Sequence, residues 1–162
     1  LAHHYLWRFA KEMPKSGHIE IFDRSWYGRV LVERVEGFAS QNEWQRASDE
    51  INQFEKMWTD EGTIILKFFL SLDKDEQLKR FKDRENNPDK NYKITDEDWR
   101  NRDKWNSYID AMDEMLYRTN VDYAPWIIVE GNQKHYARIK VMEEFLSRAK
   151  AHLKEYDKNN NK

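Results

Sequence analysis

Apolar residues follow two patterns along the chain. A spacing of three and four residues predicts amphipathic helices, and short continuous apolar runs predict buried strands. The predicted helices cover residues 1–13, 41–61, 74–86, 96–117 and 132–156. The predicted strands cover residues 18–22, 63–72 and 124–131. Because the strands alternate with long helices, the pattern indicates an α/β fold with a parallel sheet.

Several of the helix ends carry residues with a defined local role. Ser40, followed three residues later by Glu43, matches a capping box, and Thr95 with Asp98 marks another helix start in the same way. Gly37 stands where a short helix within SWYGRVLVERVEGF (25–38) is expected to end, and Gly62 follows the helix over 41–61. These signals give the predicted helices definite limits.

The composition narrows the class of protein. The 162 residues fit one domain, and the 39% of hydrophobic residues supply a core beneath a surface rich in the 36% of charged ones. A formal net charge of −2 excludes a generally basic nucleic-acid binder. No apolar run approaches the ~20 residues of a membrane span, and no cysteine is present for disulfides or thiolate metal sites. We therefore expect a cytoplasmic protein with neither a nucleic-acid nor a membrane partner.

The predicted strand over residues 18–22 leads directly into Asp23 and Arg24. In parallel sheets, ligands bind beyond the carboxyl ends of the strands. An acid at such an end can help to hold Mg²⁺, which takes one or two carboxylates together with phosphate oxygens. The same acid could instead cap the following segment, and the local pattern leaves both interpretations open.

Three arginines, Arg24, Arg29 and Arg34, surround this strand end. Their planar guanidinium groups suit phosphate, so the cluster could form an anion site. Arg29 and Glu33 also have the i, i+4 spacing of a helical ion pair. The arginines could therefore belong to a solvated, salt-bridged face instead.

A second charged region covers residues 79–104, where lysines and arginines alternate with acids around an Asn-Pro break. Basic side chains on a helical lid could close over bound phosphates and exclude water. A solvated helical hairpin would have the same composition, so charge alone does not decide between the two.

The residues of these regions resemble the family-2 polyphosphate kinases. HIEIFDRSWYGRVLVERVEGF (18–38) is similar to the family's Walker B region, an apolar strand followed by D-R-S-W-Y-N/G-R and V-E-R-V-x-G-F. RFKDRENNPDKNYKITDEDWRNRDKWNSY (80–108) looks like its lid, and DEMLYRTNVDYAPWIIVEGNQKHYAR (113–138) looks like the segment that carries its last strand. The opening AHHYLWRF and Gly28 are most similar to the polyphosphate:AMP phosphotransferase branch.

The resemblance implies a P-loop kinase-like fold, with a three-layer parallel sheet and a helical lid over about residues 74–118. It implies phosphoryl transfer between inorganic polyphosphate and a nucleotide, with Mg²⁺ as the cofactor and conversion of AMP to ADP favoured over transfers that involve ADP and ATP. Asp23 and Arg24 would be catalytic, with Asp23 near the metal. The phosphate- and nucleotide-binding residues would be Arg29, Glu33, Arg34, Arg80, Arg84, Lys90, Lys93 and Arg118, with Arg100 and Arg102 as further lid-side candidates.

One family motif, the Walker A loop G-x-D-x-x-G-K-G, does not occur in the 162 residues. We therefore expect residues 1–156 to form the C-terminal part of a kinase domain that lacks the first strands and the P-loop, followed by a disordered tail over 157–162. The Walker A backbone and lysine supply much of the positioning and charge stabilisation in phosphoryl transfer, so we expect this chain alone to have little activity. An incomplete sheet has an unpaired edge, so we also expect a homo-oligomer.

Two other functions remain compatible with the sequence. One is a catalytically silent module that binds polyphosphate or a nucleotide. The other is a structural module whose arginines are all engaged in salt bridges.

Overall fold

The computed structural model describes residues 2–160, and the chain divides into two compact units. The first unit comprises the residues up to Ile64 together with Trp99–Ala124. The second comprises Ile65–Asp98 together with the residues from Pro125 on. Each unit therefore contains segments that are distant in the sequence.

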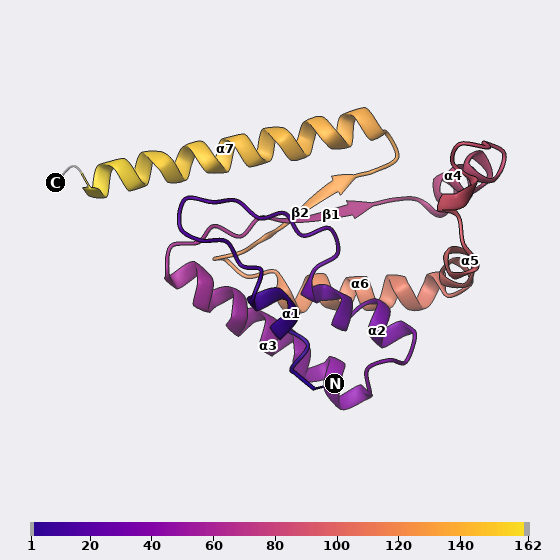
Figure 1. The fold of residues 1–162 in the computed structure, drawn as a ribbon, viewed down its shortest axis with the longest axis horizontal. Helices are drawn as coiled ribbons and strands as arrows, with labels where there is room; N and C mark the ends of the chain where they lie inside the picture. Colours follow the sequence, from indigo (N-terminus) through magenta and orange to yellow (C-terminus); the bar gives the residue numbers. More distant parts are fainter. Residues whose placement is uncertain (1, 161–162) are drawn as a thin grey trace. The chain divides into compact units, whose positions relative to one another are not determined.

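The first unit is helical, and its core lies between two helices that pack side by side, α3 and α6 (Figure 1). Its elements are α1 (Trp7–Ala10), the 3₁₀ helix η1 (Trp26–Arg29), α2 (Val32–Val35), α3 (Gln41–Asp60) and α6 (Trp105–Thr119), with the end of α5 (Asp96–Asp103). Ile51 and Phe54 on α3, with Ala111 and Met115 on α6, are buried. Their i, i+3 and i, i+4 spacing is the apolar face that the sequence predicts.

The second unit contains the sheet. Its elements are β1 (Lys67–Ser71), α4 (Lys74–Glu85), η2 (Asn91–Lys93), β2 (Trp126–Glu130) and α7 (Lys134–Asn160). Strands β1 and β2 pair in parallel, with Lys67 opposite Trp126, and α7 packs against β2 (Figure 1). Ile127 and Val129 of β2 are buried. The parallel sheet of an α/β fold is therefore confirmed.

Both predicted helix caps form. The backbone N–H of Ser40 donates to the Glu43 carboxylate at 2.8 Å, in a complete capping box at the start of α3. The backbone N–H of Thr95 donates to Asp98 at 2.9 Å. Gly37 and Gly62 have φ values of +74° and +89°, the left-handed conformation that glycine adopts at no steric cost when it ends a helix.

The strand predicted over residues 18–22 is wrong. This segment is irregular, and Ile19 and Ile21 are 69% and 84% exposed. A strand exists only through a ladder of hydrogen bonds to a neighbour, and within residues 2–160 this segment has no such ladder. The sheet of the described residues accordingly has two strands, where the sequence predicts three.

Other limits also differ from the predicted ones. The helix predicted over 96–117 is interrupted at Lys104, which separates α5 from α6, and β1 is shorter than the run 63–72. Leu70 is 62% exposed, so β1 has one exposed face, whereas its continuous apolar run predicts a strand buried on both faces. The tail predicted to be disordered over 157–162 is helical as far as Asn160, and its last two residues lie outside the described residues.

The remaining parts of the predicted architecture, the three-layer sheet, the P-loop fold, the partial domain and the helical lid, stay predictions. None of the helices within residues 2–160 combines the length and the apolar composition required to cross a lipid bilayer.

Candidate phosphate-binding residues

Asp23 and Arg24 lie on an exposed turn of the first unit. Neither side chain has a hydrogen bond or an ion pair with any other residue in the range 2–160, so Asp23 does not cap the following segment. Arg24 has a φ of +69°, a left-handed conformation that costs a residue with a Cβ atom roughly 1–2 kcal/mol. Strain of this kind persists only where the surrounding structure imposes it, and it is concentrated at functional sites.

Aromatic side chains fix the turn on both sides. Phe22, directly before Asp23, packs edge-on against Trp26 with ring centroids 5.4 Å apart. Trp26 is buried and also packs against Phe9 and Phe54, at 5.8 and 5.2 Å. The turn is therefore exposed at its tip and anchored in the core at both ends.

The buried carboxylate of Glu55 on α3 holds the residues that follow the turn. Its Oε1 accepts hydrogen bonds from Trp26 Nε1 at 3.0 Å and from the Tyr27 hydroxyl at 2.7 Å. Burial raises the pKa of Tyr27 above its usual range, and the adjacent Glu55 raises it further. Tyr27 therefore remains a neutral hydrogen-bond donor. The sequence interpretation missed Glu55, although an acid four residues after Ile51, on the apolar face of a predicted helix, is a signal that could have found it.

Arg29 lies inside the first unit. It is 5% exposed, and its guanidinium pairs with Glu33 at 2.7 Å and Glu43 at 3.4 Å and lies 4.7 Å from the centroid of the Tyr5 ring. The i, i+4 pair that the sequence predicts is therefore formed. Glu33 also accepts from Arg8 at 2.9 Å. A phosphate group would have to displace these carboxylates to reach Arg29.

Arg34 and Arg118, which are 84 positions apart, share one acid, Glu114. Arg34 pairs with it at 2.7 Å and stacks 3.9 Å from the centroid of the Trp44 ring, while Arg118 pairs at 3.2 Å. Burial alone would raise the pKa of Glu114, but the hydrogen bond and charge of Arg34, followed by those of Arg118, outweigh it and hold the pKa below its ordinary value. The structure thus brings these two candidates together.

Arg100 also has an acidic partner in the first unit. Its Nε lies 3.3 Å from the side chain of Glu36, which also pairs with Lys104 at 3.0 Å and is itself 5% exposed. These contacts tie the junction of α5 and α6 to the residue that follows α2. Arg102 lies on the same helix, α5.

Arg80 of the second unit is fixed at the carboxyl end of β2. Its guanidinium donates to the carbonyl oxygens of Gly131 and Asn132 at 2.7 and 2.9 Å and pairs with Glu76 at 2.8 Å. Asn132 also exchanges hydrogen bonds with Asp73, which follows β1. These bonds join the ends of the two strands, the region of a parallel sheet where ligands bind.

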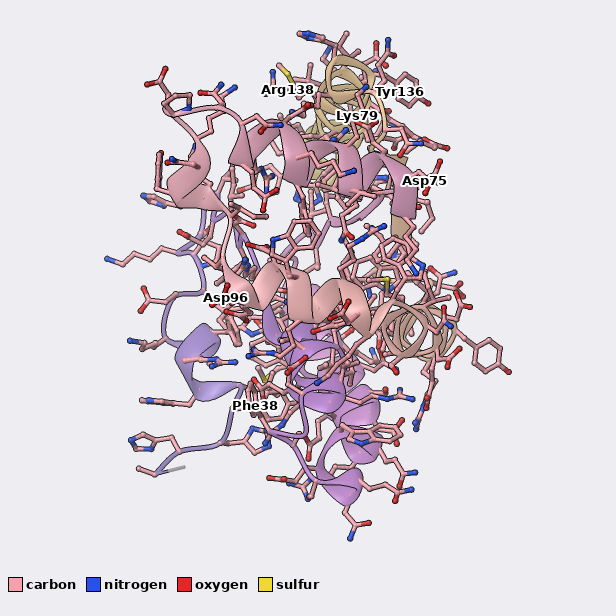
Figure 2. The ribbon with its side chains drawn as sticks, turned by 90° about the vertical axis from the view of Figure 1, so that its right-hand side faces the viewer. Phe38, Asp75, Lys79, Asp96, Tyr136 and Arg138 are labelled. Atoms are coloured by element: carbon pink, nitrogen blue, oxygen red, sulfur yellow. The ribbon has the colours of Figure 1, made fainter. Side chains whose placement is uncertain are left out.

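Arg84, Lys90 and Lys93 differ from Arg80, because no described acid lies within ion-pair distance of any of them. Lys90 and Lys93 are both exposed. Lys90 directly precedes η2, and Lys93 is its last residue and lies 5.5 Å from the Tyr92 ring centroid. One face of α4 carries both signs of charge, including Asp75 and Lys79 in the first half of the helix (Figure 2). Arg84, Lys90 and Lys93 therefore form a group of cations without a described acidic partner at the end of α4 and at η2.

A metal cage made by protein side chains alone is not found in the part of the chain that the structure describes, since no three His, Asp or Glu residues cluster suitably. One exposed carboxylate with no competing cation, Asp23, is compatible with the way Mg²⁺ binds through one or two carboxylates and substrate phosphates.

The fold and these residues define an α/β protein with an acid–arginine turn and several candidate anion-binding cations. A family model, Polyphosphate kinase 2, matches residues 1–157, and the chain therefore belongs to the Polyphosphate kinase 2 family. The resemblance seen in the sequence is confirmed at this level.

Individual relatives agree with this assignment. The chain is 55% identical over 138 residues to a polyphosphate:AMP phosphotransferase of Pseudomonas aeruginosa, across 85% of this chain and 28% of that protein. It is 56% identical over 147 residues to a polyphosphate:AMP phosphotransferase of Acinetobacter johnsonii, across 91% of this chain and 31% of that protein. The crystal structure of polyphosphate kinase 2 from Arthrobacter aurescens matches with a TM-score of 0.87 at 40% identity, across 90% of this chain and 52% of that chain. The chain spans less than a third of the length of these two curated relatives.

Proposed function

We propose that the protein to which this chain belongs transfers a phosphoryl group between inorganic polyphosphate and a nucleotide, with AMP as the favoured acceptor. The observation that carries the proposal is the exposed, strained Asp23–Arg24 turn, anchored in the core, in a chain 55–56% identical to polyphosphate:AMP phosphotransferases. Asp23 and Arg24, which make no hydrogen bond or ion pair among residues 2–160, are available for a charged ligand.

Asp23 would supply the carboxylate of a Walker B segment. In P-loop enzymes an acid in this role helps to hold Mg²⁺, which neutralises charge that develops on the transferring phosphoryl group. Arg24 would add a planar guanidinium that can donate two parallel hydrogen bonds to phosphate oxygens. Both side chains act by binding and positioning, because phosphoryl transfer needs little covalent chemistry from the protein.

The other cations fall into two roles under this proposal. Arg84, Lys90 and Lys93, which lack acidic partners among the described residues, would bind the polyphosphate chain directly. Arg29, Arg34, Arg80 and Arg118 already make ion pairs or hydrogen bonds, so they would mainly hold the segments that carry the binding groups. Glu33 would orient Arg29.

The 162-residue chain assayed alone should show little transfer. No glycine-rich phosphate loop with its lysine occurs in the sequence, and that loop supplies much of the charge stabilisation in P-loop enzymes. Binding of polyphosphate without turnover by this chain is therefore expected.

The test is an Mg²⁺-dependent assay of the full-length protein with polyphosphate and either AMP or ADP. Asp23→Asn keeps the size of the side chain and removes its charge, and it should lower kcat by roughly 100-fold or more. Asp49→Asn, the same change at an exposed acid on α3, is the matched control and should leave kcat unchanged. The proposal fails if the wild-type protein shows no transfer or if Asp23→Asn transfers normally, and binding without turnover in the full-length protein would identify a silent binding module.

A further inference from the structure

Glu55 is a buried acid that has no direct role in the proposed phosphoryl transfer. Its side chain is 0% exposed, on the face of α3 that carries Ile51 and Phe54. A buried carboxylate is costly unless it is hydrogen-bonded, and a buried polar cluster replaced as a whole by apolar residues of similar volume often keeps its stability. Stability alone therefore does not explain an acid at this position.

Two donors to Glu55 come from one short segment. Trp26 and Tyr27 are adjacent in sequence, lie 29 and 28 positions from Glu55, and donate to the same oxygen. They are also the first two residues of η1 and directly follow the Asp23–Ser25 turn. One carboxylate thus fixes where η1 begins and how its backbone is rotated.

Fixing the start of η1 also restricts the turn before it, because few residues separate the two anchored positions. Phe22 and Trp26 pack against each other, so only three residues connect a fixed position before the turn to a fixed position after it. With so short a span, the backbone has few ways to close, and Arg24 adopts a φ of +69°. If the second anchor were released, Arg24 could relax to the more stable right-handed region.

We propose that Glu55 is a positioning residue, which acts through Trp26 and Tyr27 to hold Asp23 and Arg24 in the conformation that binds phosphate. This inference rests on the proposed function for its consequence in catalysis. Its structural part, that Glu55 determines the order of the turn, is independent of the reaction.

The experiment compares three variants of the full-length protein. Glu55→Leu removes the acceptor while keeping the volume, and Glu55→Gln keeps an oxygen that can accept from both donors. Ile51→Ala removes a fully buried side chain one helical turn earlier and serves as the control for lost stability. Each variant is measured by hydrogen–deuterium exchange of the peptide around residues 19–30, by thermal unfolding, and by kcat and KM.

Glu55→Leu should speed exchange across the turn and lower kcat by roughly 10-fold or more, since small displacements of binding groups have large effects on rate. Glu55→Gln should restore most of both properties. Ile51→Ala should lower the unfolding midpoint with normal exchange at the turn and normal kcat at temperatures where it is folded. If Glu55→Leu does not fold, Tyr27→Phe, which removes one donor, should raise exchange at the turn in the same direction.

Two outcomes would overturn the inference. One is a folded Glu55→Leu, or a Tyr27→Phe standing in for it, with unchanged exchange at the turn. The other is a loss of kcat in Glu55→Leu no larger than in Ile51→Ala of equal stability. If the wild-type protein transfers no phosphoryl group, the proposed function fails, and the exchange measurement still decides whether Glu55 orders the turn.

Discussion

Two pairs of basic side chains, one pair in each unit, are held in opposite ways. In the first unit, Arg29 and Arg34 pair with acids, stack on aromatic rings and are partly or fully withdrawn from solvent. In the second, Lys90 and Lys93 are exposed and have no described acid within ion-pair distance. The two arginines are held in place by carboxylates and aromatic rings, whereas the two lysines are exposed to solvent. Arg29 and Arg34 therefore contribute to the stability of the first unit, whereas Lys90 and Lys93 of the second unit are accessible to a ligand.

The largest effect that tests this contrast is expected at Arg29. Arg29→Ala leaves two acids without their buried partner and should lower the free energy of unfolding by roughly 3 kcal/mol or more. Calorimetry of the full-length protein measures the change. Arg46→Ala is the control, because Arg46 is 54% exposed and its pair with Glu50 is of the surface kind, for which a change within about 0.5 kcal/mol is expected. Equal effects of the two substitutions would contradict the contrast.

A smaller effect, on binding instead of stability, is expected in the second unit. Replacing Lys90 and Lys93 together by alanine should weaken polyphosphate binding by roughly 10-fold at low salt and less at high salt, because exposed charges are screened. The unfolding midpoint should not move. Lys150→Ala, an exposed lysine on α7, serves as the control in the same titration. Identical affinities for the two variants would show that the cations at η2 do not contact the ligand.

The smallest effect concerns acid sensitivity in the first unit. The pKa of Glu114 is lowered in the folded protein, so its ion pairs stabilise the fold above the ordinary carboxyl pKa and are lost as pH falls through the folded-state value. Glu114→Gln should therefore lose less stability than the wild type between about pH 5 and pH 3, by under about 1 kcal/mol because the side chain is partly exposed. Thermal unfolding over this pH range measures it, and parallel pH profiles for the two proteins would exclude a contribution from Glu114.

The sequence predicted best the features that depend on neighbours along the chain. The Ser40–Glu43 and Thr95–Asp98 caps and the Arg29–Glu33 pair form as expected, since all their groups lie within four residues of each other. The strand over residues 18–22 was wrong for the opposite reason. An apolar run becomes a strand only when another strand lies beside it, and no local pattern reports that.

The candidate site shows the same difference between local features, which the sequence predicted, and long-range contacts, which it did not. Motifs identified the Asp23–Arg24 segment, but they did not indicate that Arg29 is buried among acids from two different elements. Nor did they reveal that Glu114, 80 positions from Arg34, joins this arginine to Arg118. Such partnerships are made by the packing of α2, α3 and α6, so they follow from the fold and not from the spacing of charged residues.

At Arg24, the residue that would best stabilise the left-handed backbone differs from the residue that the proposed function requires. Glycine there would relieve the steric strain and asparagine would tolerate it better, and either would remove the guanidinium. A library of variants selected only for resistance to heat should therefore drift away from arginine at this position, and one selected for phosphoryl transfer should return to it. The frequency of arginine at position 24 after each kind of selection would show whether the contribution of its guanidinium to transfer outweighs the cost of its strained backbone.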